Sequence, residues 1–415
     1  MANELFAGSQ AVLYAAKEAT YGTPRSLSGA MAMRTLSERL SGAEEREVRP
    51  DRSGNSDHLE RYVGRKSADF EVTKLILPNG AGYVEPDDGV LWEAAFGHAS
   101  LGSTSIEYIQ ATAHTTSLTL RRGIRAGTTN EGELQEHVLG AIVNAVEVSW
   151  GARGNNGLAQ VVFRGQGKEY GWTGNASLHS RKAPSDPIFA TAPAVTLSSV
   201  AANIGQFSRG SIVKILKRDT PAGPGYTWNT GGGSGIVVST LNQTTNRMTF
   251  LQALGATLGA NGATVMPYNP APITAGSPLH ARIGALSLDG FTSSIDHLGG
   301  VVTFEDNRTL LNEEVGYDSA SRVLRNDRRN VTFSLDFILR KDKVSALLGA
   351  MLKRTAQNIH VHIGDQTYKK MYIVMKNCEF DYVPIDVPDQ QMVRIAMTGR
   401  ALGTVGNDSL KVRFL

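Results

Sequence analysis

The 415-residue chain contains a single cysteine, few prolines and no long hydrophobic run. One cysteine, Cys378, excludes an intrachain disulfide framework and any zinc or iron–sulfur site built from several cysteines. No stretch approaches the roughly 18 consecutive apolar residues that a membrane-spanning helix needs. The N-terminus lacks a basic segment followed by an apolar one, so no signal peptide is indicated. These absences predict a soluble protein that is made in a cytoplasm and has no membrane partner.

The chain also lacks a dominant charge. Its 42 basic and 39 acidic residues give a formal charge of +3, which is too small for a nucleic-acid-binding surface spread over this length. Hydrophobic residues make up 41%, enough to bury a core. The 44 glycines far outnumber the 15 prolines, a composition typical of short strands joined by tight turns. We therefore expect a mainly β protein rather than a helical repeat or coiled coil.

Motifs that carry chemistry are missing as well. There is no Gly-x-Ser-x-Gly or His-Glu-x-x-His sequence, and no pair of carboxylates stands out. The glycine-rich segment 231–235 lacks the lysine and hydroxyl residue of a phosphate-binding loop and precedes a strand instead of a helix. His360 and His362 share one face of an expected strand, but no third ligand has a metal-site spacing. The sequence predicts no catalytic, cofactor-binding or metal site.

Hydrophobic periodicity indicates several secondary-structure elements. Alternating apolar residues predict a hairpin of strands 146–150 and 159–163, and a strand over 331–339. A short helix is expected over 90–96, capped by Asp87 or Asp88 and ended by Gly97, and a second helix after Asp342. Further strands are expected at 211–215, 235–239, 247–250, 264–266, 372–375, 378–383, 393–397 and 411–414.

Composition divides the chain into three zones. From 187 to 280 there is one carboxylate, Asp219, together with twelve glycines, and prolines flank this stretch on both sides. We expect residues 186–283 to form a small inserted β-barrel. Residues 1–185 and 284–415 are two strand-rich halves, each with one short helix, and they predict one core that the insert interrupts.

Residues 37–66 carry seven acidic and seven basic side chains with little apolar content between them. Such a segment is expected to be a solvated loop, or an arm that meets a charged partner, because it has little surface to bury in a core.

Arginines gather in two other places. For these two groups an interface or a solvated face is favoured over nucleic-acid binding, because no aromatic stacking residues are interleaved and acidic residues lie nearby. The two groups are Arg121, Arg122 and Arg125, and Arg322, Arg325, Arg328 and Arg329.

Four segments together resemble the major tail tube proteins of bacteriophages with long, non-contractile tails. They are the opening Glu18-Ala19-Thr20-Tyr21-Gly22-Thr23-Pro24; the charged segment followed by Gly64 and a strand near Phe70; the pattern from Gly140 to Ser149 followed by a turn and Val161-Val162-Phe163-Arg164-Gly165; and the unit from Arg328 through Leu348. The resemblance is one of texture and order and covers the two outer zones.

The resemblance implies a tail-tube-type β-sandwich or barrel with one or two short flanking helices, and an insert on the outer surface. It implies a non-enzymatic virion protein that polymerises as stacked homohexameric rings into the tail tube, the conduit for DNA ejection. Implied partners are other copies of the chain, a tape-measure protein, the tail terminator and distal tail proteins, and double-stranded DNA that passes without specific binding. The protein would be made in the host bacterial cytoplasm.

In such a tube, the charged segment is a candidate for contacts between subunits or rings, since its balanced charges allow identical copies to pair. A lumen that conducts DNA is expected to be neutral or acidic, because basic rings would hold the phosphates. The candidate contact residues are Glu44, Glu45, Arg46, Glu47, Arg49, Asp51, Arg52, Asp57, Glu60 and Arg61.

Other functions remain open at this stage. The chain could be a β-rich adhesin or glycan-binding module of a virion, with the insert as the binder, and a hydrolase would need a cleft with converging carboxylates. The sequence also leaves open whether a ring holds six copies of one tube domain or fewer copies of a doubled one.

Overall fold

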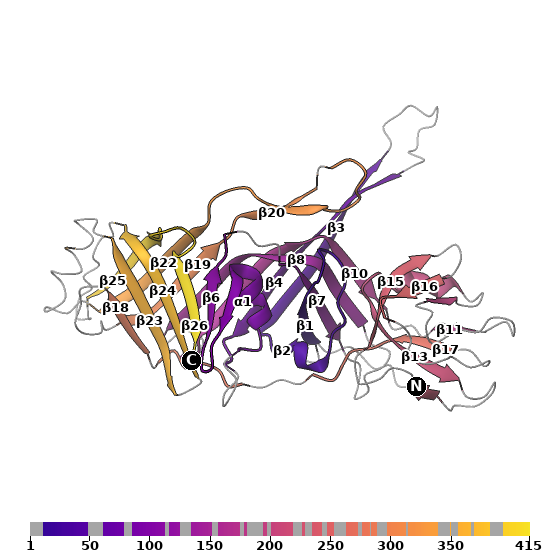
Figure 1. Cartoon of the computed structure of the whole chain (residues 1–415), viewed down its shortest axis with the longest axis horizontal. Coiled ribbons are helices and arrows are strands. Elements are labelled where there is room, and N and C mark those ends of the chain that lie inside the picture. The colour runs from indigo at the N-terminus through magenta and orange to yellow at the C-terminus, as the bar shows by residue number, and fades with distance from the viewer. Residues whose placement is uncertain are drawn as a thin grey trace.

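The computed structural model is mainly β, as predicted, with one α-helix among the described residues (Figure 1). The structure describes residues 11–48, 61–78, 85–112, 116–124, 134–151, 157–174, 178–180, 194–196, 201–218, 226–228, 235–242, 247–252, 263–272, 276–282, 284–288, 297–312, 314–338, 349, 356–366, 369–381 and 393–415.

The first part of the chain forms ten strands and the helix, here called the first bundle. In order they are β1 (Ala11–Lys17), β2 (Ala32–Met33), β3 (Ser37–Val48), β4 (Arg61–Leu75), α1 (Gly89–Phe96), β5 (Gly97–Leu101), β6 (Ile106–Gln110), β7 (Leu118–Ile124), β8 (Leu134–Gly151), β9 (Gln160–Gly167) and β10 (Glu169–Thr173). Neighbouring strands pair in the order β1-β7-β8, then β8-β9-β4-β3, with β10 paired to the first part of β8.

The last part forms the second bundle. Its strands are β18 (Gly284–Leu288), β19 (His297–Glu305), β20 (Arg308–Leu311), β21 (Arg322–Arg325), β22 (Asn330–Ile338), β23 (Gln357–Gln366), β24 (Lys369–Phe380), β25 (Arg394–Ala401) and β26 (Leu410–Phe414). They pair in the order β18-β23-β24, then β24-β25-β22-β19, with β26 paired to the first part of β24.

Two strand pairs join the bundles into one 17-stranded sheet. The second part of β8 pairs with β19, and β6 pairs with β26, both antiparallel. One hydrophobic cluster runs through both bundles. Within it, the ring centroid of Trp92 lies 5.2 Å from that of Phe163 and 5.8 Å from that of Phe414. The bundles therefore share a seam of hydrogen-bonded backbone over a continuous core.

Local predictions in both bundles are confirmed. Helix α1 follows Asp88, its N-cap residue, and ends at Gly97, which adopts the left-handed conformation with φ of 87°. The predicted hairpin pairs Val146 with Phe163, and the 331–339 strand is β22 with every second side chain buried. In place of the two strands predicted at 372–375 and 378–383, the structure has a single strand, β24, that ends at Phe380. The helix expected after Asp342 falls almost entirely outside the described residues.

The expectation that the charged segment 37–66 is a loop is wrong over its ends. Residues 37–48 are β3, and residues from Arg61 belong to β4, which pair in a long antiparallel hairpin. The physical reason is alternation: Leu40 and Phe70 are paired and both buried in the core, while the charged neighbours lie elsewhere on the strands. Residues 49–60 lie outside the described part.

The middle region is the insert. Its strands are β11 (Leu178–Ser180), β12 (Ala194–Thr196), β13 (Ile212–Arg218), β14 (Tyr226–Trp228), β15 (Ile236–Asn242), β16 (Arg247–Phe250) and β17 (Ala263–Pro267), with a 3-10 turn at Ala201–Gln206. The described strands follow the open order β11-β17-β13-β15-β16-β12, with β14 beside β13. The predicted barrel is therefore not closed by the described strands, because the end strands β11 and β12 are three residues long and each pairs with one neighbour only.

The insert has a core of its own and packs on one side of the first bundle (Figure 1). Val213, Ile215 and Met248 belong to its internal cluster. A separate cluster joins Ile212, Val237 and Tyr268 of the insert region to Tyr14 and Leu27 of the first bundle.

Candidate assembly interfaces

The second bundle sends an arm over the first. It spans residues 306–329, includes the antiparallel pair β20–β21, and leaves the bundle at the end of β19 (Figure 1). Near its tip, the Asp318 carbonyl accepts a 2.8 Å hydrogen bond from the Lys66 amide, and Ser319 forms a parallel bridge with Lys66. The arm thus holds the base of the β3–β4 hairpin.

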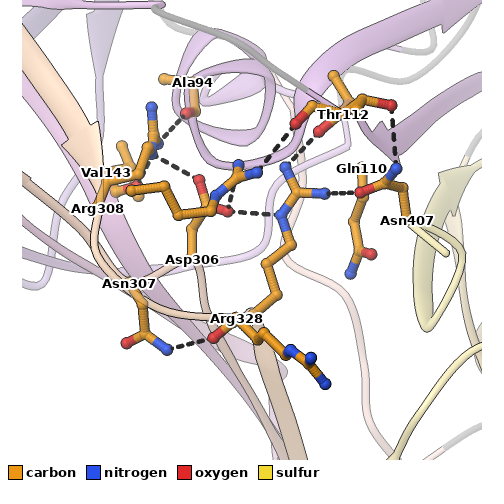
Figure 2. Close-up of polar contacts among 12 residues, drawn as sticks. Ala94, Gln110, Thr112, Val143, Asp306, Asn307, Arg308, Arg328 and Asn407 are labelled. Carbon is orange, nitrogen blue, oxygen red and sulfur yellow. Dashed lines mark hydrogen bonds and ion pairs between the residues drawn. The ribbon is translucent and has the colours of Figure 1, made fainter.

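The root of the arm is organised around a fully buried carboxylate, Asp306 (Figure 2). Its oxygens face three guanidinium groups: Arg308 Nε at 2.5 Å, Arg329 Nε at 2.6 Å and an Arg325 terminal nitrogen at 3.1 Å. Three charge-assisted partners compensate a buried carboxylate for the hydration that it loses. Burying the same carboxylate without partners would cost several kcal/mol of folding free energy.

The three arginines around Asp306 also bind carbonyl oxygens of the first bundle. Arg308 donates to the carbonyl oxygens of Ala94, at 2.9 Å in the last turn of α1, and Val143, at 2.7 Å in β8. The C-terminal end of a helix has unpaired carbonyls and a partial negative charge, so a cation is favoured there. Arg325 donates to the Thr112 carbonyl at 2.9 Å, and Arg329 donates to the Ala111 carbonyl. Carbonyl oxygens of the first bundle therefore offset the excess positive charge around Asp306.

Burial and the two neighbouring arginines outweigh Asp306 at Arg308 and lower the pKa of its guanidinium to about 10. Arg308 is therefore charged at neutral pH. Arg329 also donates to the Asn407 side chain at 2.8 Å, which links the cluster to the loop before β26 (Figure 2).

Five of the ten predicted contact residues lie on the β3–β4 hairpin. Glu44, Glu45, Arg46 and Glu47 are on β3 and Arg61 is on β4, while Arg49, Asp51, Arg52, Asp57 and Glu60 lie outside the described residues. The Glu45 carboxylate accepts a 3.3 Å hydrogen bond from the Arg65 amide. A role of these residues in contacts between subunits stays a prediction.

The structure also brings together residues that no sequence spacing predicted. Asp306 and Arg308 were not expected: the arginines around Asp306 lie up to 23 residues away, and the carbonyl partners of Arg308 lie more than 160 residues away in the chain. Of the second arginine group, Arg325 and Arg329 lie in the cluster, and Arg322 pairs with Glu314.

The first arginine group lies near the insert. Arg121 is fully buried and donates to the Tyr268 carbonyl at 2.7 Å and to the Asn269 side chain. Arg122 pairs with Glu136, and Arg125 lies outside the described residues. Arg121 thus joins the first bundle to the chain that leaves the insert.

His137 is the second buried polar side chain of this junction. Its Nε2 lies 2.6 Å from the Arg209 carbonyl, so the ring is a donor there. Burial lowers the pKa of His137 to about 4, with Arg121 and Arg209 acting in the same direction. The ring is therefore neutral at physiological pH.

Glu18, the first residue of the opening segment that resembles tail tube proteins, has a structural role. Its buried carboxylate accepts hydrogen bonds from the amides of Gly22 (2.7 Å) and Gly140 (2.9 Å) and from the hydroxyls of Ser117 and Thr119. Burial raises the pKa of Glu18 in spite of these bonds. The carboxylate fixes the turn after β1 against the point where β8 bends.

A continuous eight-stranded ribbon, β3-β4-β9-β8-β19-β22-β25-β24, presents one apolar and one polar face. The apolar face carries residues such as Phe70, Phe163 and Phe333 in the core. On the polar face Arg164 lies between Glu71, at 2.9 Å, and Glu147, at 3.0 Å.

His362 stacks on Tyr372 at 4.5 Å between ring centroids, and the described residues hold no group of three or more histidine, cysteine or acidic side chains placed for a metal ion. Within the same described ranges, no helix is both long and apolar enough to cross a membrane.

Comparison with known proteins defines the class. A family model described as phage tail tube protein matches residues 8–212, which contain β1 to β12 and reach the start of β13. This match supports a phage tail tube protein, a structural protein of the bacteriophage virion tail. No curated protein matches the chain.

The matched family indicates the coarse function. Phage tail tube proteins are structural and not catalytic, and they self-assemble into the tube of the virion tail. The predicted resemblance to tail tube proteins is confirmed at this level.

Proposed function

We propose that the chain polymerises as stacked rings, each with six tube folds, into a tail tube through which DNA is ejected. The observation that carries this proposal is the eight-stranded ribbon with one core face, one polar face and β3 at its end. A strand edge without a partner is a template for pairing with another chain, and a head-to-tail contact that repeats by rotation closes a ring.

The polar face of the ribbon is suited to line the lumen. Acidic side chains outnumber basic ones there: the acidic residues are Asp69, Glu71, Glu147, Glu305, Asp336, Glu379 and Asp381, and the basic ones are Arg39, Arg164, Arg394 and Arg400. Two of the acidic side chains share Arg164, which reduces its attraction for phosphate. Such a wall repels DNA weakly and releases few counterions, so the double strand passes without being held.

The charged hairpin β3–β4 is suited to contacts between copies. Glu44 to Glu47 and Arg61 lie on the paired strands, beyond the core pair Leu40–Phe70. Ion pairs between identical copies would set orientation and register more than affinity. Within the virion, the tape-measure, tail terminator and distal tail proteins are the expected neighbours of the tube.

Negative-stain microscopy of the purified full-length protein and of virions tests the proposal. The expected result is hollow tubes that label with an antibody to the chain along the virion tail. Monomers in every salt and concentration condition, together with virion tails that lack the chain, would contradict it.

The insert allows a second test. We place it on the outer surface of the tube, and a variant lacking residues 186–283 should still assemble, whereas a glycan-binding protein would lose its ligand. Because Arg121 and Gln135 contact the insert, the deletion is compared with one that also carries R121Q. The described aromatic side chains Phe207, Phe250 and Tyr268 are buried, so none of these three offers a ring for stacking on a sugar.

A further inference from the structure

The two bundles have the same topology. Strands β1, β7, β8, β10, β9, β4 and β3 pair in the same order and direction as β18, β23, β24, β26, β25, β22 and β19. In each bundle the longest central strand pairs first with one neighbour and then, further along, with another. Seven strands in one shared order make two copies of a single fold.

Irregularities fall at the same places in both bundles. The β7–β8 pairing shifts between the pairs Leu118–Ala141 and Leu120–Val138, and the β23–β24 pairing shifts between Gln357–Cys378 and Ile359–Met375. Gly140 directly precedes Ala141 in β8, and Asn377 directly precedes Cys378 in β24. Both residues adopt the left-handed conformation, with φ of 62° and 51°. Matching bulges are specific features of a fold and rarely coincide by accident.

A glycine lies under an aromatic ring at the same position of each bundle. Gly165 pairs with Phe70 and Gly399 with Phe333. A Cβ at Gly165 would meet the Ile142 carbonyl and the Phe70 ring, and a Cβ at Gly399 would meet the Glu379 carbonyl and the Phe333 ring. These pairs align the two bundles residue by residue.

The alignment places the two arms in register. Phe70 pairs with Leu40, and Phe333 pairs with Val302, so Glu44-Glu45-Arg46 corresponds to Asp306-Asn307-Arg308. On the returning strands, Arg65-Lys66 corresponds to Arg328-Arg329. Both arms therefore begin with an acidic residue, and an arginine follows two positions later.

We infer that the chain is a tandem of two tube folds and that the seam between them is the template for the contact between neighbouring copies in a ring. Strand β19 of the second fold lies on β8 of the first, so β3 of one copy would meet the next copy where β24 ends, at Asp381. This inference rests on the proposed function: a ring of six tube folds then contains three chains.

The edge that the neighbour would cover is unpaired. Among the described residues β3 pairs with β4 alone, whereas its counterpart β19 pairs on both sides. Beside this edge, Ala43 and Glu44 line a groove of about 350 Å³ with Trp172, whose side chain is 54% exposed. An exposed strand edge beside an exposed tryptophan is typical of a surface that another chain covers.

The seam within the chain also predicts which residues meet between two copies. Within the chain, the Asp306 amide donates to the Asn144 carbonyl at 2.8 Å. The equivalents are Glu44 in one copy and Asp381, just after β24, in the next.

Cross-linking assembled tubes tests the inference. The double variant E44C/D381C is assembled and treated with a short bismaleimide, then separated on a denaturing gel. Since each contact joins two chains, the expected ladder ends at three chains when the ring closes. Single variants E44C and D381C should give no ladder, because the native Cys378 is buried and its pKa is raised to about 12.

A variant at the internal seam is the matched control. In S149C/V301C the two cysteines face each other across β8–β19, so oxidation links residues of one chain and leaves its mass on the gel unchanged. A ladder that ends at six chains, or tubes without any ladder, would overturn the inference while leaving the tube function intact. Failure of the wild-type protein to form tubes would instead contradict the proposed function.

Discussion

The two bundles reach the same strand order with different chemistry inside. Lys74 in β4 is fully buried and paired with Asp87 and Asp88, while the equivalent residue in β22 is Phe337, also fully buried. His137 in β8 corresponds to Val374 in β24. The comparison teaches that strand register, bulges and close-approach glycines define this fold, and that buried positions accept either an apolar side chain or a satisfied polar one.

The arms differ in their state of contact. Asp306 is buried because its arm lies on the first bundle, whereas Glu44 is half-buried on β3, which among the described strands pairs with β4. One arm thus contacts the other bundle through a buried carboxylate, and the other arm presents a half-buried one.

The largest expected effect comes from D306A. It leaves Arg308 and Arg329 without their carboxylate in a buried site and should lower the free energy of unfolding by about 3–5 kcal/mol. The counterpart E44A should change the stability of the monomer by less than about 0.5 kcal/mol, since the residue is part-exposed, but should impair tube formation. Urea unfolding of the monomer and microscopy of the assembled protein measure the two effects. Equal destabilisation by both variants would contradict the comparison.

Acid should have the next largest effect on stability, through a titrating residue of the first bundle that has no titrating counterpart in the second. The pKa of His137 is about 4 in the folded state against an ordinary 6.5, so the unfolded state binds the proton first and stability is lost as pH falls from 6.5 towards 4. At pH 4 the loss amounts to about 3 kcal/mol.

In H137Q this part of the pH dependence should disappear, because glutamine does not titrate. Unfolding free energies of both proteins at pH 6.5 and 4.5 provide the measurement. Parallel pH profiles for wild type and H137Q would show that His137 does not carry the effect.

The paired glycines should respond alike. In G165A the new Cβ would lie 1.9 Å from the Ile142 carbonyl, and in G399A 2.2 Å from the Glu379 carbonyl. Backbone must move in both cases, and we expect each to cost about 1–3 kcal/mol. Thermal denaturation compares them with the control G174A, whose nearest neighbours would be 3.6 Å away. A large cost at only one of the two positions would break the equivalence.

The smallest effect is expected at the left-handed positions. N377G should stay within about 1 kcal/mol of wild type, because glycine adopts this conformation freely and only the 2.9 Å bond from the Asn377 side chain to the Gly403 carbonyl is lost. G140A should cost more, about 1–2 kcal/mol, since alanine is strained at this φ. Chemical denaturation resolves the difference, and the reverse ranking would argue against a shared bulge.

Sequence patterns predicted elements whose burial alternates within one strand, such as β22 and the β8–β9 hairpin. They missed β3, because residues 37–45 hold one large apolar side chain, Leu40, between charged neighbours, and pairing with β4 supplies the rest. The repeat was also invisible, since the aligned residues share geometry more than identity. Lys74 and Phe337 fill one position with opposite chemistry.

The sequence by itself determined a mainly β chain without disulfides or catalytic motifs, because composition and alternation are local properties. It also indicated the tail tube family through the order of its segments. Only the tertiary structure decided that Asp306 gathers three arginines, that β8 and β19 form a seam, and that β3 ends a ribbon with an unpaired edge. The seam, and the contacts of Arg308 with the first bundle, join residues far apart in the chain, and no local pattern encodes which distant backbone a strand edge will meet.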